Sequence, residues 1–126
     1  MNGEGRAVSR KILVGVKDLM FGSKIHEAAK RSGTELSFAP RFERLRDVAK
    51  ARSPEVLIVD LGEPGMLEEL AAVKADAPSV RIIGFCGHVF ESVMAAADKL
   101  GVDEVMTRGQ FAARVEAELV RERGAA

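Results

Sequence analysis

Asp60 is the residue of this chain best placed to do chemistry, because it closes the most apolar segment of the sequence. That segment, EVLIVDL at 55–61, is a continuous apolar run of the kind buried on both faces in a parallel sheet. A turn rich in Pro and Gly, DLGEPG, begins at the aspartate. A carboxylate at this strand end could act as a nucleophile or a metal ligand. It could equally accept hydrogen bonds from the backbone of its own turn.

Polar or reactive side chains also follow the other predicted strands. Cys86 could be a redox-sensing thiol beside His88, or a small apolar filler at a strand end. His88 could be a general base, or a residue of an exposed loop that caps the next helix. Asp18 has the side chain of a helix N-cap. The candidate crevice residues beside Asp60 are Lys17, Asp18, Cys86, His88 and Arg108.

Length and composition limit the classes of function. The chain has 126 residues, with 19 basic and 19 acidic side chains and a formal net charge of zero. A single cysteine excludes an intrachain disulfide and fits a reducing cytoplasm, and two histidines far apart argue against a metalloenzyme. The charge balance and the absence of Trp and Tyr argue against nucleic-acid binding. No apolar run approaches the roughly 20 residues of a membrane span, so we expect a cytoplasmic protein without a membrane partner.

Strand-like and helix-like segments alternate along residues 11–123, which we expect to form one domain after a disordered lead-in at 1–10. No output domain is expected. Strict alternation implies parallel strands with right-handed crossovers and helices on both faces. The predicted fold is α/β, a flavodoxin-like doubly wound five-stranded parallel sheet of order 2-1-3-4-5, with its crevice at the carboxyl ends of the strands. The strands are expected at 11–16, 35–39, 55–61, 80–85 and 103–106, each followed by a helix.

Two glycines interrupt predicted strands at matching depth. Gly15 lies in the first strand and Gly84 in the fourth. Either could admit a ligand or a closely packed helix, and the helix is the simpler expectation.

The segment 54–66, PEVLIVDLGEPGM, resembles the third strand and following loop of bacterial response-regulator receiver domains, the CheY-like family. In that family this aspartate accepts a phosphoryl group in a two-component phosphorelay, so the resemblance makes Asp60 the phosphoacceptor position. Pro64 matches the proline four residues later. The likeness continues through KILVGVKD, RIIGFCGH and VDEVMTRGQF and covers about residues 10–119.

The sequence departs from the family at its metal site. Receivers end strand one with two adjacent acidic residues that hold Mg²⁺ with the phosphoacceptor, whereas this chain has Val16 and Lys17 there, and Asp18 comes one step later. This replacement removes oxygen ligands and adds a repelling charge. We therefore expect Lys17 to pair with Asp60 in place of the cation.

Four further family positions differ. The switch hydroxyl at the end of strand four is replaced by Cys86, and the aromatic residue of strand five by Val105. The lysine at the end of strand five is Arg108, and the proline after it is Gly109. Arginine keeps the charge but not the compact point donor of lysine.

These departures predict a degenerate pseudo-receiver, a stand-alone signalling module that acts by protein–protein interaction. It is expected to be no enzyme, with at most very slow autophosphorylation at Asp60, to need no cofactor and to lack Mg-dependent phosphorylation. The alternative is an atypical response regulator phosphorylated on Asp60 by a histidine kinase, with Mg²⁺ or with Arg108 and Lys17 as charge neutralisers. A small ligand in the crevice is a third possibility, although GxGxxG, DxHxxG and a hydroxyl-rich phosphate loop are all missing.

The partner surface is expected on residues 89–119, from Val89 to Leu119, the face that receivers commonly use. A second copy of the chain is one candidate partner, giving a homodimer. The arginine-rich stretch 41–52 could also contact an acidic partner, or be a solvated helix face. The side chains expected to carry contacts on the 89–119 face are Glu91, Lys99, Arg108, Gln110 and Arg114.

Overall fold

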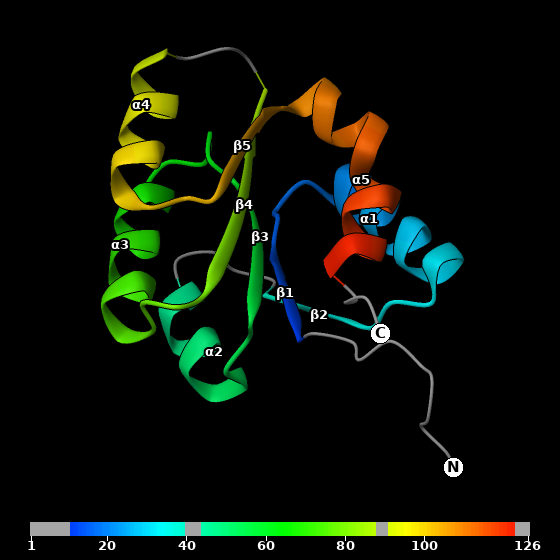
Figure 1. Cartoon of the computed structure of the whole chain (residues 1–126), viewed down its shortest axis with the longest axis horizontal. Coiled ribbons are helices and arrows are strands. Elements are labelled where there is room, and N and C mark those ends of the chain that lie inside the picture. The colour runs from blue at the N-terminus through cyan, green and yellow to red at the C-terminus, as the bar shows by residue number, and fades with distance from the viewer. Residues whose placement is uncertain (1–10, 40–43, 88–90, 123–126) are drawn as a thin grey trace.

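The computed structural model describes residues 11–39, 44–87 and 91–122. The expected lead-in at 1–10, the candidate His88, the start of the partner face at Val89 and the domain end at residue 123 lie outside the described residues. Five strands alternate with five helices in this part of the chain (Figure 1). They are β1 Ile12–Gly15, α1 Leu19–Ser32, β2 Leu36–Phe38, α2 Leu45–Arg52, β3 Val56–Asp60, α3 Met66–Asp76, β4 Arg81–Cys86, α4 Glu91–Leu100, β5 Glu104–Thr107 and α5 Arg108–Glu122.

All four strand pairings are parallel, and the sheet order is β2-β1-β3-β4-β5. The predicted flavodoxin-like order is thereby confirmed. The order changes direction between β1 and β3, so the chain leaves these neighbouring strands toward opposite faces. The carboxyl ends of β1, β3, β4 and β5 therefore meet at one edge of the sheet.

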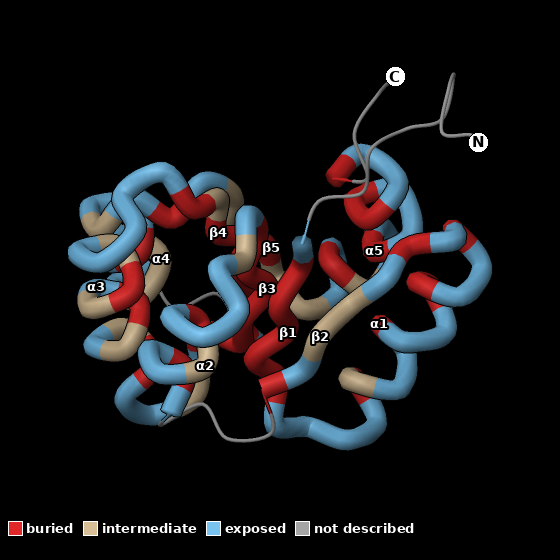
Figure 2. Tube along the Cα trace, turned by 90° about the horizontal axis from the view of Figure 1, so that it is seen from below, coloured by how far each residue is buried: buried red, intermediate tan, exposed pale blue. Residues whose placement is uncertain are grey.

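The helices cover the two faces of the sheet unequally. α1 and α5 lie on one face, and α2, α3 and α4 on the other (Figure 1). Alternation along β1 divides its side chains, with Ile12 and Val14 in the core of the first face and Leu13 in the core of the second. The central strands are buried along their length (Figure 2), as the continuous apolar runs of the sequence predict.

The last two strands begin and end one residue later than predicted. β5 extends to Thr107 because this residue pairs with Cys86 of β4, while Asp103 precedes the strand. The Asp103 carboxylate accepts a hydrogen bond from the backbone N–H of Ile82 at 2.7 Å, which accounts for an acidic residue at this point of the sheet.

The two strand glycines are packed against different neighbours. A Cβ on Gly15 would lie 3.1 Å from Leu45 Cδ1 of α2, so the closely packed helix is confirmed there. A Cβ on Gly84 would lie 2.7 Å from Leu61 Cδ1, and Leu61 belongs to the loop after β3. The expectation of a helix is therefore wrong at Gly84, where glycine makes room for a leucine side chain.

Among the described residues, none of the helices combines the length and apolar character needed to cross a bilayer.

Candidate functional site

Asp60 ends β3 at the edge where the carboxyl ends of the strands meet, and it is 4% exposed. Its Oδ1 accepts a hydrogen bond from the backbone N–H of Gly62 at 2.9 Å. Its Oδ2 accepts a hydrogen bond from Arg108 Nη2, also at 2.9 Å. The turn hydrogen bond considered from sequence is thus present, and the second carboxylate oxygen is held by a cation.

Arg108 bridges two carboxylates. While Nη2 donates to Asp60, Nη1 donates to Asp18 Oδ2 at 3.1 Å. The guanidinium carbon also lies over the Phe21 ring, 5.0 Å from its centroid, and 5.8 Å from the centroid of Phe85. A guanidinium presents its N–H groups as a fixed fork and makes cation–π contacts more often than an ammonium does. Arginine therefore suits a position that bonds two carboxylates and lies over aromatic rings.

The position of Arg108 is fixed by the start of α5. The Thr107 hydroxyl accepts a hydrogen bond from the backbone N–H of Gln110 at 3.1 Å, and the Gln110 side chain accepts one from the Thr107 N–H at 2.9 Å. This reciprocal arrangement is a capping box, for which Thr-x-x-Gln is the sequence signature. It starts the helix directly at the end of β5, so that Arg108 projects from a junction of two regular elements.

Asp18 is the N-cap of α1, as predicted from sequence. Its Oδ1 accepts a hydrogen bond from the backbone N–H of Phe21 at 3.1 Å. This bond, followed by the side-chain bond to Arg108, lowers the pKa of Asp18 below its ordinary value of 3.8. The same carboxylate thus begins a helix and holds the second end of the arginine bridge.

For Lys17, the expected pairing with Asp60 stays a prediction. The Lys17 side chain is exposed, and Asp60 forms an ion pair with Arg108. Val16 is buried in the core formed with α1 and α5, whereas Lys17 is exposed. The cation that the structure shows paired with Asp60 is Arg108, the first residue of α5.

Cys86 ends β4 and is fully buried in the core beneath α2, α3 and α4. Its neighbour Phe85 lies in the core of the opposite face, in contact with Phe21 at 4.7 Å between ring centroids. The position of Cys86 fits a small apolar filler. His88, the other candidate of this loop, lies outside the described residues.

The donor set beside Asp60 does not fit Mg²⁺, the ion that the family resemblance implies. A magnesium ion requires near-octahedral oxygen coordination, and the two carboxylates that approach each other here, of Asp18 and Asp60, are both hydrogen-bonded to the Arg108 guanidinium. The two positions after β1 that would supply further oxygens are Val16 and Lys17. No group of three or more metal-ligating side chains occurs among the described residues.

An open hollow of about 450 Å³ borders the outer side of Arg108. Asp18 and Phe21 line it together with residues of the first turns of α1. Leu19 and Met20, at the start of α1, are 88% and 86% exposed.

Comparisons with family models and with curated protein sequences give no match. Solved structures do match. Chemotaxis protein CheY4 of Vibrio cholerae superposes with a TM-score of 0.77 at 15% identity, covering 90% of this chain and 98% of CheY4. The signal receiver domain of NarL from Mycobacterium tuberculosis gives 0.77 at 18% identity, covering 92% and 97%. The isolated REC domain of RcsB from Salmonella enterica serovar Typhimurium gives 0.74 at 15%, covering 88% and 86%.

These similarities extend over nearly the whole of both chains. The chain therefore has the CheY-like receiver fold. At 15–18% identity the likeness concerns the fold, and the chemistry at Asp60 has to be argued from this chain's own residues.

Proposed function

We propose that this protein is a receiver-type signalling module that acts through protein–protein contacts and does not require phosphorylation of Asp60. The observation that carries the proposal is the Arg108 bridge between Asp60 and Asp18. It gives the aspartate a cation from within the chain. The similarity to a chemotaxis protein and to response-regulator receiver domains supports the signalling role.

Two properties of Asp60 oppose phosphoryl transfer to it. Each carboxylate oxygen already accepts a hydrogen bond, and the residue is 4% exposed, so an attacking oxygen would first have to leave a partner. The reaction also develops charge on the phosphoryl oxygens that a divalent ion usually neutralises, and the local donor set does not fit one. The switch positions of the family, Cys86 and Val105, carry neither a hydroxyl nor an aromatic ring.

Acetyl phosphate tests this proposal directly. If Asp60 reacted, its Oδ would form an acyl phosphate bond as acetate left, and the protein would gain one phosphoryl mass. We expect the intact mass to stay unchanged over hours in millimolar Mg²⁺, as measured by mass spectrometry, while a receiver with the acidic pair intact gains the group. A stable gain that disappears in Asp60→Asn would contradict the proposal and establish the alternative, an atypical receiver phosphorylated on Asp60 with Arg108 as its charge neutraliser.

Two of the side chains expected from sequence to carry contacts on the partner face, residues 89–119, do not suit that role in the structure. Arg108 is half-buried and bound to Asp18 and Asp60, so it is removed from the set of exposed contact residues. Arg114 is exposed but forms an ion pair with the buried Glu118 at 3.2 Å. Reversing its charge would place two acids together, so Arg114 is unsuitable for testing contacts. Lys99 remains exposed on α4.

We expect Lys99→Glu to weaken capture of a protein partner, or self-association if the partner is a second copy. Because the side chain is exposed, the free energy of unfolding should change by less than about 0.5 kcal/mol. Sedimentation and affinity capture measure the two cases, with thermal melting as the check on folding. Lys24→Glu on α1, also exposed, is the matched control. Equal loss in both variants, or no loss in Lys99→Glu, would move the interface away from α4.

A further inference from the structure

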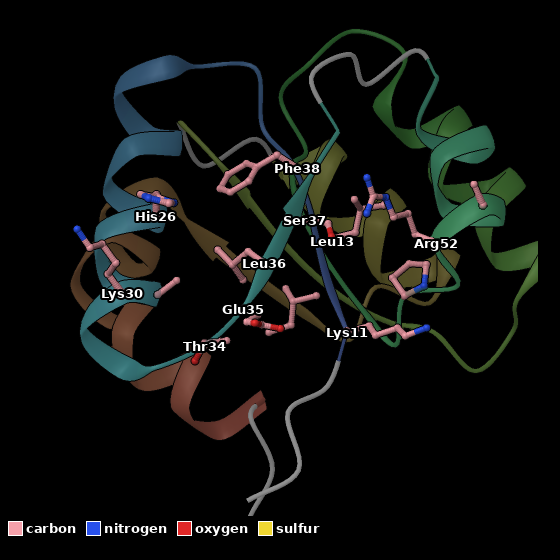
Figure 3. Close-up of a pocket in the computed structure, with 14 residues that line it drawn as sticks. Lys11, Leu13, His26, Lys30, Thr34, Glu35, Leu36, Ser37, Phe38 and Arg52 are labelled. Atoms are coloured by element: carbon pink, nitrogen blue, oxygen red, sulfur yellow. The ribbon is translucent and has the colours of Figure 1, made fainter.

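A cavity of about 740 Å³ lies at the edge of the sheet around β2 and is separate from the Asp60 crevice. It is open, and its walls come from α1 on one side of the strand and from the end of α2 on the other (Figure 3). Its lining residues include none of those that surround Asp60. The fold therefore presents a second concave surface, which the proposed function does not use.

The strand at the centre of this cavity has an edge available for pairing. β2 pairs with β1 on one side, and no other described strand pairs with it. The backbone N–H of Ala39 donates to the carbonyl of Val14 at 2.8 Å. Because successive residues of a strand point their backbone groups to opposite edges, those of Leu36 and Phe38 face away from β1. An added strand could pair with these groups.

Positive charge flanks the edge on both sides. The cations are Lys30 of α1 and, across β2 from it, Lys11 and Arg52, and His26 of α1 also lines the cavity (Figure 3). All four are exposed, and Glu35 is the acidic residue among those that line the cavity. Such a surface attracts a negatively charged partner and disfavours a positive one.

We propose that the β2 edge binds an extended acidic segment of a partner protein, which adds to the sheet as a further strand. In this mode backbone hydrogen bonds supply affinity and alternate side chains enter the pockets on either side. The α1 side offers Leu36 and Phe38 beside the cations, so an apolar side chain fits there. Acidic side chains fit the side of Lys11 and Arg52.

Other occupants agree less well with the charges. A single small anion cannot contact cations on both sides of a strand, whereas an extended chain can. A second copy paired through β2 would bring two sets of the same cations together. The chain's own segment 1–10 carries two arginines and one glutamate, so it lacks the acidic character that the edge selects.

The test uses the whole chain and an end-capped octapeptide of alternating glutamate and valine. Binding is followed by backbone amide NMR shifts and by hydrogen exchange. We expect shifts centred on β2, and slower exchange of the Leu36 and Phe38 amides, since these groups would become hydrogen-bonded. A peptide of alternating lysine and valine should not bind, and nor should the acidic peptide when its backbone nitrogens are methylated.

Charge reversal identifies the contacts. The double variant Lys30→Glu, Arg52→Glu should bind the acidic peptide at least about tenfold more weakly, a difference of about 1.4 kcal/mol. Lys24→Glu, Lys50→Glu changes the net charge equally at two exposed positions outside the cavity lining and should bind as the unaltered chain does. The proposal is overturned by equal weakening in both variants, by shifts centred on the Asp60 crevice, by inorganic phosphate producing the same shifts, or by sedimentation showing a dimer that the first variant disrupts. Each result leaves the phosphorylation test unaffected.

Discussion

Phe85→Ala should lower the free energy of unfolding by about 3–5 kcal/mol, the usual cost of removing a fully buried ring. Phe85 is completely buried in β4. Its ring centroid lies 4.7 Å from that of Phe21 and 4.9 Å from that of Phe111, and the rings of Phe85 and Phe111 are stacked. The substitution leaves a cavity where three elements meet. Urea denaturation measures the loss as a lower midpoint.

Two further variants keep this prediction testable. Phe85→Leu retains most of the buried volume and should cost about 1–2 kcal/mol, so it is measurable if Phe85→Ala does not fold. Phe38→Leu changes a ring at the exposed edge of the sheet and should cost less than about 0.5 kcal/mol. A loss below about 1 kcal/mol in Phe85→Ala would show that the three rings do not pack as described.

Arg108→Ala should lower the free energy of unfolding by about 1–3 kcal/mol. It leaves the buried Asp60 without its cation, and truncating one partner of a buried pair strands the other charge. The figure is below that for a fully buried pair because the Arg108 side chain is 35% exposed and solvent screens it. Arg31→Ala, which removes an ion pair to Glu116 with both partners exposed, is the matched control and should cost less than about 0.5 kcal/mol.

The pairing itself is isolated by a double-mutant cycle. Asp60→Asn keeps an oxygen for the Gly62 N–H but loses the charge, so Arg108→Ala should cost less in this background than in the unaltered chain. Additive losses would mean that Arg108 stabilises the domain through its ring contacts with Phe21 rather than through Asp60.

The effect of Arg108→Ala also depends on pH. The folded pKa of Asp18 is lowered by the Phe21 N–H and by Arg108. A lowered folded pKa contributes stability above the unfolded value, near 3.8, and this contribution is lost as the pH falls through the folded value. The difference between the unaltered chain and Arg108→Ala should therefore shrink as the pH falls below about 3.8, since protonated Asp18 no longer attracts the guanidinium.

The fold was predictable because its signals are repeated along the chain. Alternation of apolar runs and helical spacing fixes parallel strands, and the continuous run before Asp60 indicates a central strand. The N-cap role of Asp18 followed from its side chain. The start of α5 was predictable in principle from the capping box of Thr107 and Gln110, a signal that the strand and helix periodicities do not contain.

The arginine bridge could not be predicted in the same way. The sequence places Asp18 and Arg108 at the same crevice as Asp60. Because β1 and β5 are separated in the sheet by β3 and β4, it does not indicate that one guanidinium would bond both carboxylates. Lys17 was the nearer candidate for Asp60 along the first strand, and its side chain is exposed. Long flexible side chains reach partners that strand order alone does not specify.

The acidic side chains of α5 illustrate the same limit. Glu118 and Glu122 are buried, although the spacing of apolar residues along the helix does not predict burial of acidic side chains. Glu118 pairs with Arg114, and Glu122 with Arg81 of β4. Burial of these acids depends on arginines from other turns and strands, and the hydrophobic periodicity of the sequence does not predict such pairs.

The cation that pairs with Asp60 is a side chain of the same protein, and this has a thermodynamic consequence. An ion taken from solution stabilises a protein by an amount that grows with its free concentration. The Arg108 guanidinium belongs to the chain and is present once for every carboxylate it meets, so mass action does not regulate it. Neutralisation of Asp60 by Arg108 then does not require divalent metal around the protein, and it ends when the side chain changes conformation or another anion competes for the guanidinium.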